Sequence, residues 1–361
     1  MKKNLRNPKG SRDWLPEEVA KQEFVRKSLV EVFELWGYKP IQTPILINAD
    51  TLTQGSNKLS EVAFKLIGQH GEVLALRADL TTPIARATAE RLHNEERPFR
   101  FYYVGKVFRY HARKTTNERE LYQIGIELIG TKEGISDFEC LKILSDSLNK
   151  LGFKKYAILI NHSGLWTELF NSFGNVAYEL HKALSQKDLI LYKKILSSSG
   201  FSKNEKEFWQ ELILIKGRKD ALIKLKLISK KIKKIRLKKI ISYFENLLAV
   251  LEENIELDLS LTSDIDYYTG VYFEVVTQYL GRSPGAGGRY DQLINKFGFN
   301  LPAIGFSFCL EDLLLALENQ ETKFPDFKNP VLVKAERNIK NTFLKINRLH
   351  KQKKNAGIKY D

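Results

Sequence analysis

The chain has 361 residues, 43% of them hydrophobic, and carries a formal net charge of +15 at pH 7. This length favours two or three domains of about 100–200 residues each and leaves enough apolar side chains for a sizeable core. No stretch approaches the roughly 18 uninterrupted apolar residues of a membrane span, and the basic N-terminus lacks the apolar segment of a secretory signal. We therefore expect a cytoplasmic protein with no membrane partner.

Cysteine and histidine are too sparse and too scattered to predict a metal site. The two cysteines, Cys140 and Cys309, fit a reducing compartment and form no CxxC pair. We expect no metal and no cofactor. The net charge permits nucleic-acid binding, but the lysines are dispersed and not interleaved with aromatic residues, which favours solvated faces. The basic run 230–239 is typical of an amphipathic helix, for which an acidic partner surface stays open.

The first part of the chain predicts a helix followed by a sheet. Apolar residues recur at helical spacing over 17–36, between Pro16 and Gly37, and an extended segment with prolines follows. Strands and their connections are then predicted in this order: strand 72–81, helix 83–93, strand 100–112, polar loop 113–120 and strand 121–130. This order indicates the α+β class, with an antiparallel sheet flanked by helices.

The second part predicts more strands, interrupted by a long helical insertion. A helix is expected over 134–151 and a strand over 155–164. The lysine-rich pattern from about 165 to 255 is helical throughout, and strands return over 257–281. Residues 302–318 then form a glycine-containing strand that runs into an amphipathic helix. The tail 319–361 is short and basic and contains the apolar run "PVLV".

Polar residues of three strands could meet at one ligand site. Period-two alternation places Gln123, Gly125 and Glu127 on one face of their strand. Asp79 has a similar place on the strand before, and Arg109 ends the neighbouring one. Carboxylates would bind an ammonium group and an arginine a carboxylate or phosphate, so the set suits an amino acid. An exposed sheet face with ordinary salt bridges explains the same pattern equally well.

Three other stretches carry weaker signals. Asp266, Tyr267 and Tyr268 could supply a polar aromatic wall or ordinary core residues. "GAGGRYDQL" lacks the P-loop residues, and a tight glycine turn in which Arg289 and Asp291 pair locally is the better interpretation. At the last helix, the adjacent carboxylates Glu311 and Asp312 either serve a site or interact with the positive end of the helix dipole.

Seven motifs in order resemble the catalytic domain of histidyl-tRNA synthetases: "GSRDWLP", "WGYKPIQTP", "LRADLTTPIAR", "FRYHARKTTNERELYQIGIE", "DIDYYTG", "GGRYDQL" and "PAIGFSFCLEDLL". The resemblance spans about residues 8–318 and implies a class II aminoacyl-tRNA synthetase-like domain, interrupted by the helical insertion at about 165–255. Its sheet would have six or seven antiparallel strands, and the segment around 17–44 would form a dimer interface. The family's histidine-binding residues correspond here to Asp79, Thr81, Arg109, Gln123, Glu127, Tyr267 and Tyr268.

The chain departs from the synthetase motifs at residues that serve ATP and catalysis. Asp312 and Ser263 stand where the synthetases carry arginines, and His111 and Asp79 stand where they carry glutamates. Replacing a positive by a negative charge at about 4 Å from a phosphate costs several kcal/mol at an effective dielectric of about 20. We therefore expect no aminoacylation and no catalytic residues. About forty residues follow the last motif, too few for the synthetases' anticodon-binding domain, so tRNA is not expected as a partner.

These departures resemble the synthetase-like regulatory subunits of ATP phosphoribosyltransferase. That resemblance implies a homodimer within a hetero-oligomer, which activates a short-form catalytic subunit and mediates feedback inhibition by L-histidine. Two alternatives stay open: an active histidyl-tRNA synthetase or related amino-acid ligase, and a nucleic-acid-binding module.

Overall fold

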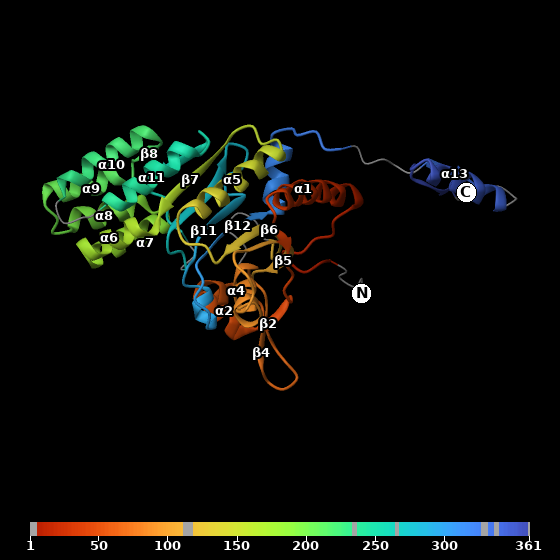
Figure 1. The fold of residues 1–361 in the computed structure, drawn as a ribbon, viewed down its shortest axis with the longest axis horizontal. Helices are drawn as coiled ribbons and strands as arrows, with labels where there is room; N and C mark the ends of the chain where they lie inside the picture. The colour runs from red at the N-terminus through yellow and green to blue at the C-terminus, as the bar shows by residue number, and fades with distance from the viewer. Residues whose placement is uncertain are drawn as a thin grey trace. The chain divides into compact units, whose positions relative to one another are not determined.

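The structure is a computed structural model that describes residues 6–110, 118–232, 237–263, 267–325, 331–335 and 339–359. The chain divides into two compact units (Figure 1). The first comprises Met1–Asp13 and Val25–Thr322, and the second comprises Trp14–Phe24 and Lys323–Asp361. Among the described residues, no helix is long and apolar enough to span a bilayer.

A mixed sheet forms the centre of the first unit, in the strand order β1-β5-β6-β12-β11-β10-β7-β9-β8 among the described residues. The pairs from β5 through β7 are all antiparallel, and the pairs β1–β5 and β7–β9 are parallel. The strands are β1 (Lys39–Pro40), β5 (Phe99–Phe108), β6 (Glu120–Ile129), β7 (Tyr156–His162), β8 (Lys216–Gly217), β9 (Ile255–Asp258), β10 (Val271–Thr277), β11 (Gly285–Arg289) and β12 (Ala303–Cys309). The predicted antiparallel α+β core is confirmed, with short parallel and edge strands added.

Helices α1 (Pro16–Leu35), α5 (Ile135–Lys150) and α12 (Leu310–Asn319) accompany this sheet. The ring of Phe33 on α1 lies 6.0 Å from that of Phe306 on β12, so the part of α1 that belongs to the first unit packs on the sheet. In α5, Cys140, Leu144 and Leu148 are spaced four apart and fully buried. The predicted strand-to-helix segment 302–318 is confirmed as β12 and α12.

A smaller sheet in the order β2-β4-β3 lies between α1 and β5 in the sequence. It consists of β2 (Leu46–Asn48), β3 (Lys65–Ile67) and β4 (Val73–Leu76), with α2 (Ala49–Gly55), α3 (Asn57–Val62) and α4 (Thr81–Arg91). The strand predicted over 72–81 is therefore too long. It ends at Leu76, and Asp79 accepts hydrogen bonds from the backbone and hydroxyl of Thr82 at the start of α4.

In the described part of the chain, six helices lie between β7 and β9: α6 (Ser163–Phe173), α7 (Asn175–Ser185), α8 (Leu189–Ser198), α9 (Lys203–Leu212), α10 (Lys219–Lys231) and α11 (Lys238–Val250). Trp166, Phe208 and Trp209 are buried among them, which gives these helices a core of their own. Figure 1 shows the helices gathered beside β7. We refer to α6–α11 as the helical insertion.

Within the central sheet, "GAGGRYDQL" contains strand β11 and then leads to the 3₁₀ turn η1 (Ile294–Phe297). The prediction of a tight glycine turn there is wrong, because Gly285, Gly287 and Arg289 pair with β12. The local pairing of Arg289 with Asp291 is confirmed, with Nη1 at 2.9 Å from Oδ1.

The second unit contains a β-α-β element in the tail. Strands β13 (Val331–Lys334) and β14 (Ala356–Lys359) pair in parallel, and α13 (Ile339–Lys351) connects them. Within the same unit, the rings of Phe24 and Phe324 meet edge to face at 5.8 Å.

Candidate functional site

Glu127 lies at the centre of a buried polar cluster in the first unit. It sits on β6 with 1% of its surface exposed. Thr81 Oγ1 donates a hydrogen bond to Glu127 Oε1 at 2.7 Å, and the hydroxyl of Tyr290 donates to Oε2. Burial raises the pKa of Glu127 to about 7, although the Tyr290, Thr81 and Tyr103 hydroxyls lower it. The carboxyl group can therefore bind a cation once it is ionised, close to neutral pH.

Glycine residues on the neighbouring strands make space around Glu127. Gly305 of β12 is paired with Glu127, and a Cβ at position 305 would lie 1.9 Å from Oε2 of Glu127. Gly125, two residues earlier on β6, faces Tyr103, and a Cβ there would lie 2.7 Å from the Tyr103 hydroxyl. Both positions need glycine because a Cβ would also meet a backbone carbonyl oxygen, that of Phe306 at 2.1 Å from position 125 and that of Ile126 at 2.4 Å from position 305.

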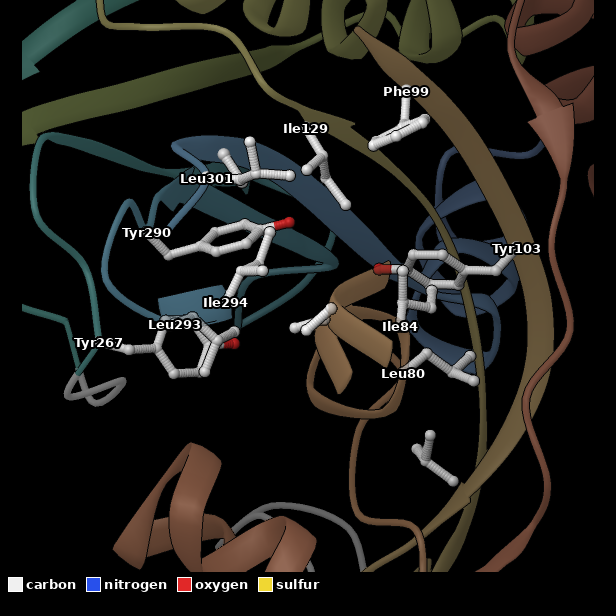
Figure 2. Packing of buried hydrophobic residues seen from close by; sticks show 14 of the residues in the cluster. Leu80, Ile84, Phe99, Tyr103, Ile129, Tyr267, Tyr290, Leu293, Ile294 and Leu301 are labelled. Atoms are coloured by element: carbon white, nitrogen blue, oxygen red, sulfur yellow. The ribbon is translucent and has the colours of Figure 1, made fainter. Parts of the chain in front are cut away.

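Tyrosine rings surround the carboxylate. Figure 2 shows Tyr103 and Tyr290 with their hydroxyl groups directed toward one another inside the hydrophobic cluster. The ring of Tyr267 lies 5.8 Å from that of Tyr290 and 5.5 Å from that of Tyr268. Burial raises the pKa of each of these phenols above its ordinary value, so they stay protonated, and the Tyr290 hydroxyl donates to Glu127.

Asp79 brings a second carboxylate to the cluster. It is 4% exposed, and its Oδ2 accepts from the backbone N–H and hydroxyl of Thr82 at 3.0 and 2.9 Å. Among the described residues its Oδ1 is buried with no hydrogen-bond partner. Burial raises the pKa of Asp79, whereas Arg109 and Arg77 lower it. An unpaired buried carboxylate oxygen is costly, so a ligand donor at this place would be stabilising.

Arg109 and Gln123 lie at the margin of the cluster. Arg109 Nε donates to the carbonyl oxygen of Ala78 at 2.9 Å, which holds the guanidinium near Asp79. Gln123 lies on the Glu127 face of β6, and its Nε2 donates to Ser307 Oγ at 3.4 Å. Within the described part of the chain, Gln123 Oε1 is buried and unpartnered.

The structure thus brings together most of the residues predicted from the sequence. Asp79, Thr81, Glu127, Tyr267 and Tyr268 form one cluster, with Arg109 and Gln123 beside it. His111 and Asp266 lie outside the described residues.

Tyr103 and Tyr290 were not predicted as site residues. The signal for Tyr103 was available: it lies opposite Gly125 on the neighbouring strand, at a position that alternation places on the face of Glu127. Tyr290 could not be predicted because its stretch was interpreted as a turn, and a turn does not indicate on which face of the sheet a side chain lies.

The adjacent carboxylates at the start of α12 have local partners. Asp312 is 2% exposed, and Arg282 Nε donates to its Oδ1 at 2.7 Å. Glu311 accepts from the N–H of Tyr122 and from the thiol of Cys309. Burial raises the pKa of Glu311 to about 7. The negative charge at this helix start is therefore balanced within the chain by Arg282.

The described residues hold no group of three or more His, Cys, Asp or Glu side chains placed to bind a metal ion. The donors and acceptors of the cluster suit an organic ligand with ammonium, carboxylate and ring N–H groups.

Comparisons with known proteins agree with this fold. The histidyl-tRNA synthetase family model matches residues 10–313. The ATP phosphoribosyltransferase regulatory subunit of Bacillus licheniformis is 36% identical over 87% of this chain and 82% of its own length. That of Carboxydothermus hydrogenoformans is 33% identical over 90% of this chain and all of its own length. A crystal structure from Bacillus halodurans, described as an ATP phosphoribosyltransferase regulatory subunit/histidyl-tRNA synthetase, superposes with a TM-score of 0.86 at 29% identity, covering 99% of this chain and 93% of that one.

With this similarity along most of its length, the chain belongs to the family of ATP phosphoribosyltransferase regulatory subunits, which share the histidyl-tRNA synthetase fold.

Proposed function

We propose that this chain is the non-catalytic regulatory subunit of an ATP phosphoribosyltransferase in histidine biosynthesis, and that it binds L-histidine in the cluster around Glu127. A short-form catalytic subunit would need the chain for activity. Histidine would inhibit the complex by binding its inhibited state more tightly than its active state. The names of the relatives support the regulatory role.

One observation carries the ligand assignment. Asp79 Oδ1 and Gln123 Oε1 are buried acceptors without partners among the described residues; Asp79 interacts electrostatically with the buried carboxyl of Glu127, and Gln123 lies on the same strand. Histidine offers an ammonium group and a ring N–H, which are the donors that such acceptors lack. In this assignment, Asp79, Gln123 and Glu127 bind the ammonium and imidazole groups. Arg109 binds the carboxylate, and Tyr267 and Tyr268 form the wall.

The start of α12 supports a role without aminoacylation. Activation of an amino acid by ATP needs cationic groups at the phosphates. At this point of the fold the chain places Asp312, whose charge is taken up by Arg282. A carboxylate at position 312 offers no positive charge to the phosphates of a nucleotide. We therefore propose that the chain does not form an aminoacyl adenylate.

Exposed apolar side chains support the proposed homodimer. Within the first unit, Leu35 is 86% exposed, and Trp36, Ile45 and Leu46 are also solvent-accessible. They fall in or next to the segment around 17–44 that the family resemblance implies as a dimer interface. Burying them against a second copy would remove this apolar surface from water.

The decisive experiment combines the chain with a short-form ATP phosphoribosyltransferase. We expect the two to co-purify, the activity of the catalytic subunit to rise in the complex, and L-histidine to reduce it. A complex that forms and works but ignores histidine would refute the ligand assignment alone. Histidine-dependent ATP–pyrophosphate exchange by the chain would instead favour the synthetase alternative.

A further inference from the structure

Arg289, which precedes Tyr290 in the chain, is a buried cation whose hydrogen-bond donors are all used. Its side chain is 1% exposed. All five of its N–H groups have an acceptor within 2.5–2.9 Å. These acceptors are Asp137 Oδ1, which accepts twice, Ser136 Oγ, Asp291 Oδ1 and the carbonyl oxygen of Thr131. A guanidinium bound in this way cannot shift without breaking several buried hydrogen bonds together.

Asp137 connects Arg289 to the helical insertion. Its side chain is fully buried at the first turn of α5. While Oδ1 binds Arg289, Oδ2 accepts from the N–H of Gly134 and from the hydroxyl of Tyr243, both at 3.0 Å. Tyr243 belongs to α11, the last helix of the insertion. One carboxylate therefore joins the central sheet to the insertion.

The position of Tyr243 is defined by a second contact. Its ring lies 5.1 Å from the ring of His162 at an angle of 67°. His162 is itself held from both sides, because Gly164 donates its N–H to Nδ1 at 2.9 Å and Nε2 lies 2.7 Å from Glu133 Oε1. The hydroxyl of Tyr243 is thus aimed at Asp137 by packing as well as by hydrogen bonding.

At the other end, Tyr290 reaches the proposed ligand site. Its hydroxyl donates to Glu127, and its N–H donates to the carbonyl oxygen of Ala303 at 2.8 Å. The carbonyl oxygen of Arg289 accepts from the N–H of Thr269 at 2.7 Å. Neighbouring residues of an extended segment point to opposite sides, so the side chain of Arg289 binds Asp137 while that of Tyr290 binds Glu127. The backbone that these two residues share connects the two contacts.

We propose that Tyr243 and Arg289 are positioning residues for the ligand site. They act through the chain of contacts Tyr243–Asp137–Arg289–Tyr290–Glu127, so that ligand binding at Glu127 and the packing of the helical insertion are coupled. Protein interiors are close-packed, so a residue of this chain of contacts cannot move without displacing the residues bound to it. By reciprocity, a change at the insertion alters ligand affinity, and ligand binding alters the insertion by the same free energy. The inference rests on the proposed function, which supplies L-histidine as the ligand.

The first test measures L-histidine affinity by titration calorimetry on the full chain. Tyr243→Phe removes one hydroxyl and keeps the ring contact with His162. We expect it to weaken binding by about two- to thirtyfold, the range for residues that modulate coupling without touching the ligand. Tyr192→Phe is the matched control, because the Tyr192 hydroxyl is also buried in the insertion but donates to the carbonyl oxygen of Trp209. Unchanged affinity in Tyr243→Phe, or an equal loss in both variants, would overturn the proposal.

The second test needs no histidine and follows hydrogen exchange of the α11 amides. Tyr290→Phe removes the donor to Glu127, and we expect it to speed exchange in α11 while α8 keeps its wild-type rate. In the Tyr243→Phe background, Tyr290→Phe should have no further effect on α11. Unchanged α11 exchange, or equal acceleration of α11 and α8, would refute the coupling. If the wild-type chain fails to bind histidine, the proposed ligand is wrong, and the exchange experiment still decides the coupling.

Discussion

Asp312 and Arg282 form a buried ion pair at the first turn of α12, with side chains 3% and 17% exposed. A charge pair that is buried to this degree loses much of its hydration, and the attraction between the partners offsets this loss only while both are present. The pair therefore explains why a carboxylate is tolerated at this place. It also predicts that an arginine at position 312, which the family resemblance implies for the synthetases, would be destabilising in this chain.

Asp312→Arg should not create an ATP site. The new guanidinium would lie beside Arg282 in a buried environment, and we expect a loss of about 3–5 kcal/mol in the free energy of unfolding. Urea unfolding measures this loss, and ATP–pyrophosphate exchange should stay absent. The matched control replaces both partners, Asp312→Leu with Arg282→Met, and should unfold close to wild type. A stable Asp312→Arg variant that performs exchange would contradict both the structural role of the pair and the proposed loss of aminoacylation.

Glu127→Gln should weaken L-histidine binding by about 10- to 100-fold, as expected when a hydrogen bond to a charged group worth about 1.5–3 kcal/mol is removed. The amide keeps the size of the side chain, so the Gly305 contact is preserved. Equilibrium dialysis or calorimetry measures the affinity. The control is Glu120→Gln, on the same strand but paired with Lys106 at the surface. Equal affinities for Glu127→Gln and wild type would remove Glu127 from the ligand site.

The central sheet could be predicted from the sequence because its strands carry strong local signals. The β12–α12 segment combines alternation with a helical apolar pattern, and both elements occur where expected. The short helices α2 and α3 carry seven and six residues, too few for a periodic pattern to stand out. The segment after Leu76 was predicted to stay extended, yet Asp79 and Thr82 start a helix there through side-chain hydrogen bonds.

The polar cluster around Glu127 was predicted in part, and the members that were missed have a physical cause. Glu127 and Gln123 share one strand, so alternation alone places them together. Tyr290 joins them through the register of three strands, β11, β12 and β6, and no local pattern specifies that register. The contact between Tyr243 and Asp137 joins residues 106 positions apart, which only the folded chain reveals.

The pH dependence of histidine binding should report the titration of Glu127. Burial holds the pKa of Glu127 at about 7, whereas an ammonium ligand needs the ionised carboxylate. Affinity should therefore rise with pH up to about 7 and level off above, with roughly a tenfold loss per unit below. Calorimetry between about pH 5.5 and 8.5 measures this. The ligand's imidazole titrates in the same pH range. Glu127→Gln is therefore the reference, because the side chain at position 127 no longer titrates and the ligand's own titration remains. Identical profiles for the two proteins would contradict the assignment.

Gly305→Ala tests whether the space beside Glu127 is required. The added methyl group would lie 1.9 Å from Glu127 Oε2 and 2.4 Å from the carbonyl oxygen of Ile126, and the backbone oxygen cannot move aside as a flexible side chain would. We expect overpacking to lower the free energy of unfolding by about 1–3 kcal/mol and to displace the carboxylate from Tyr290.

Histidine affinity should fall in the same variant, because the displaced carboxylate no longer faces the site. Gly200→Ala is the control, since a Cβ at position 200 has no atom within 4 Å among the described residues. Alanine there replaces glycine without a clash, and reduced unfolded-state entropy should leave stability equal or slightly higher. If Gly305→Ala binds histidine as well as Gly200→Ala does, the ligand does not depend on the position of Glu127, and the pocket must be sought elsewhere on the sheet.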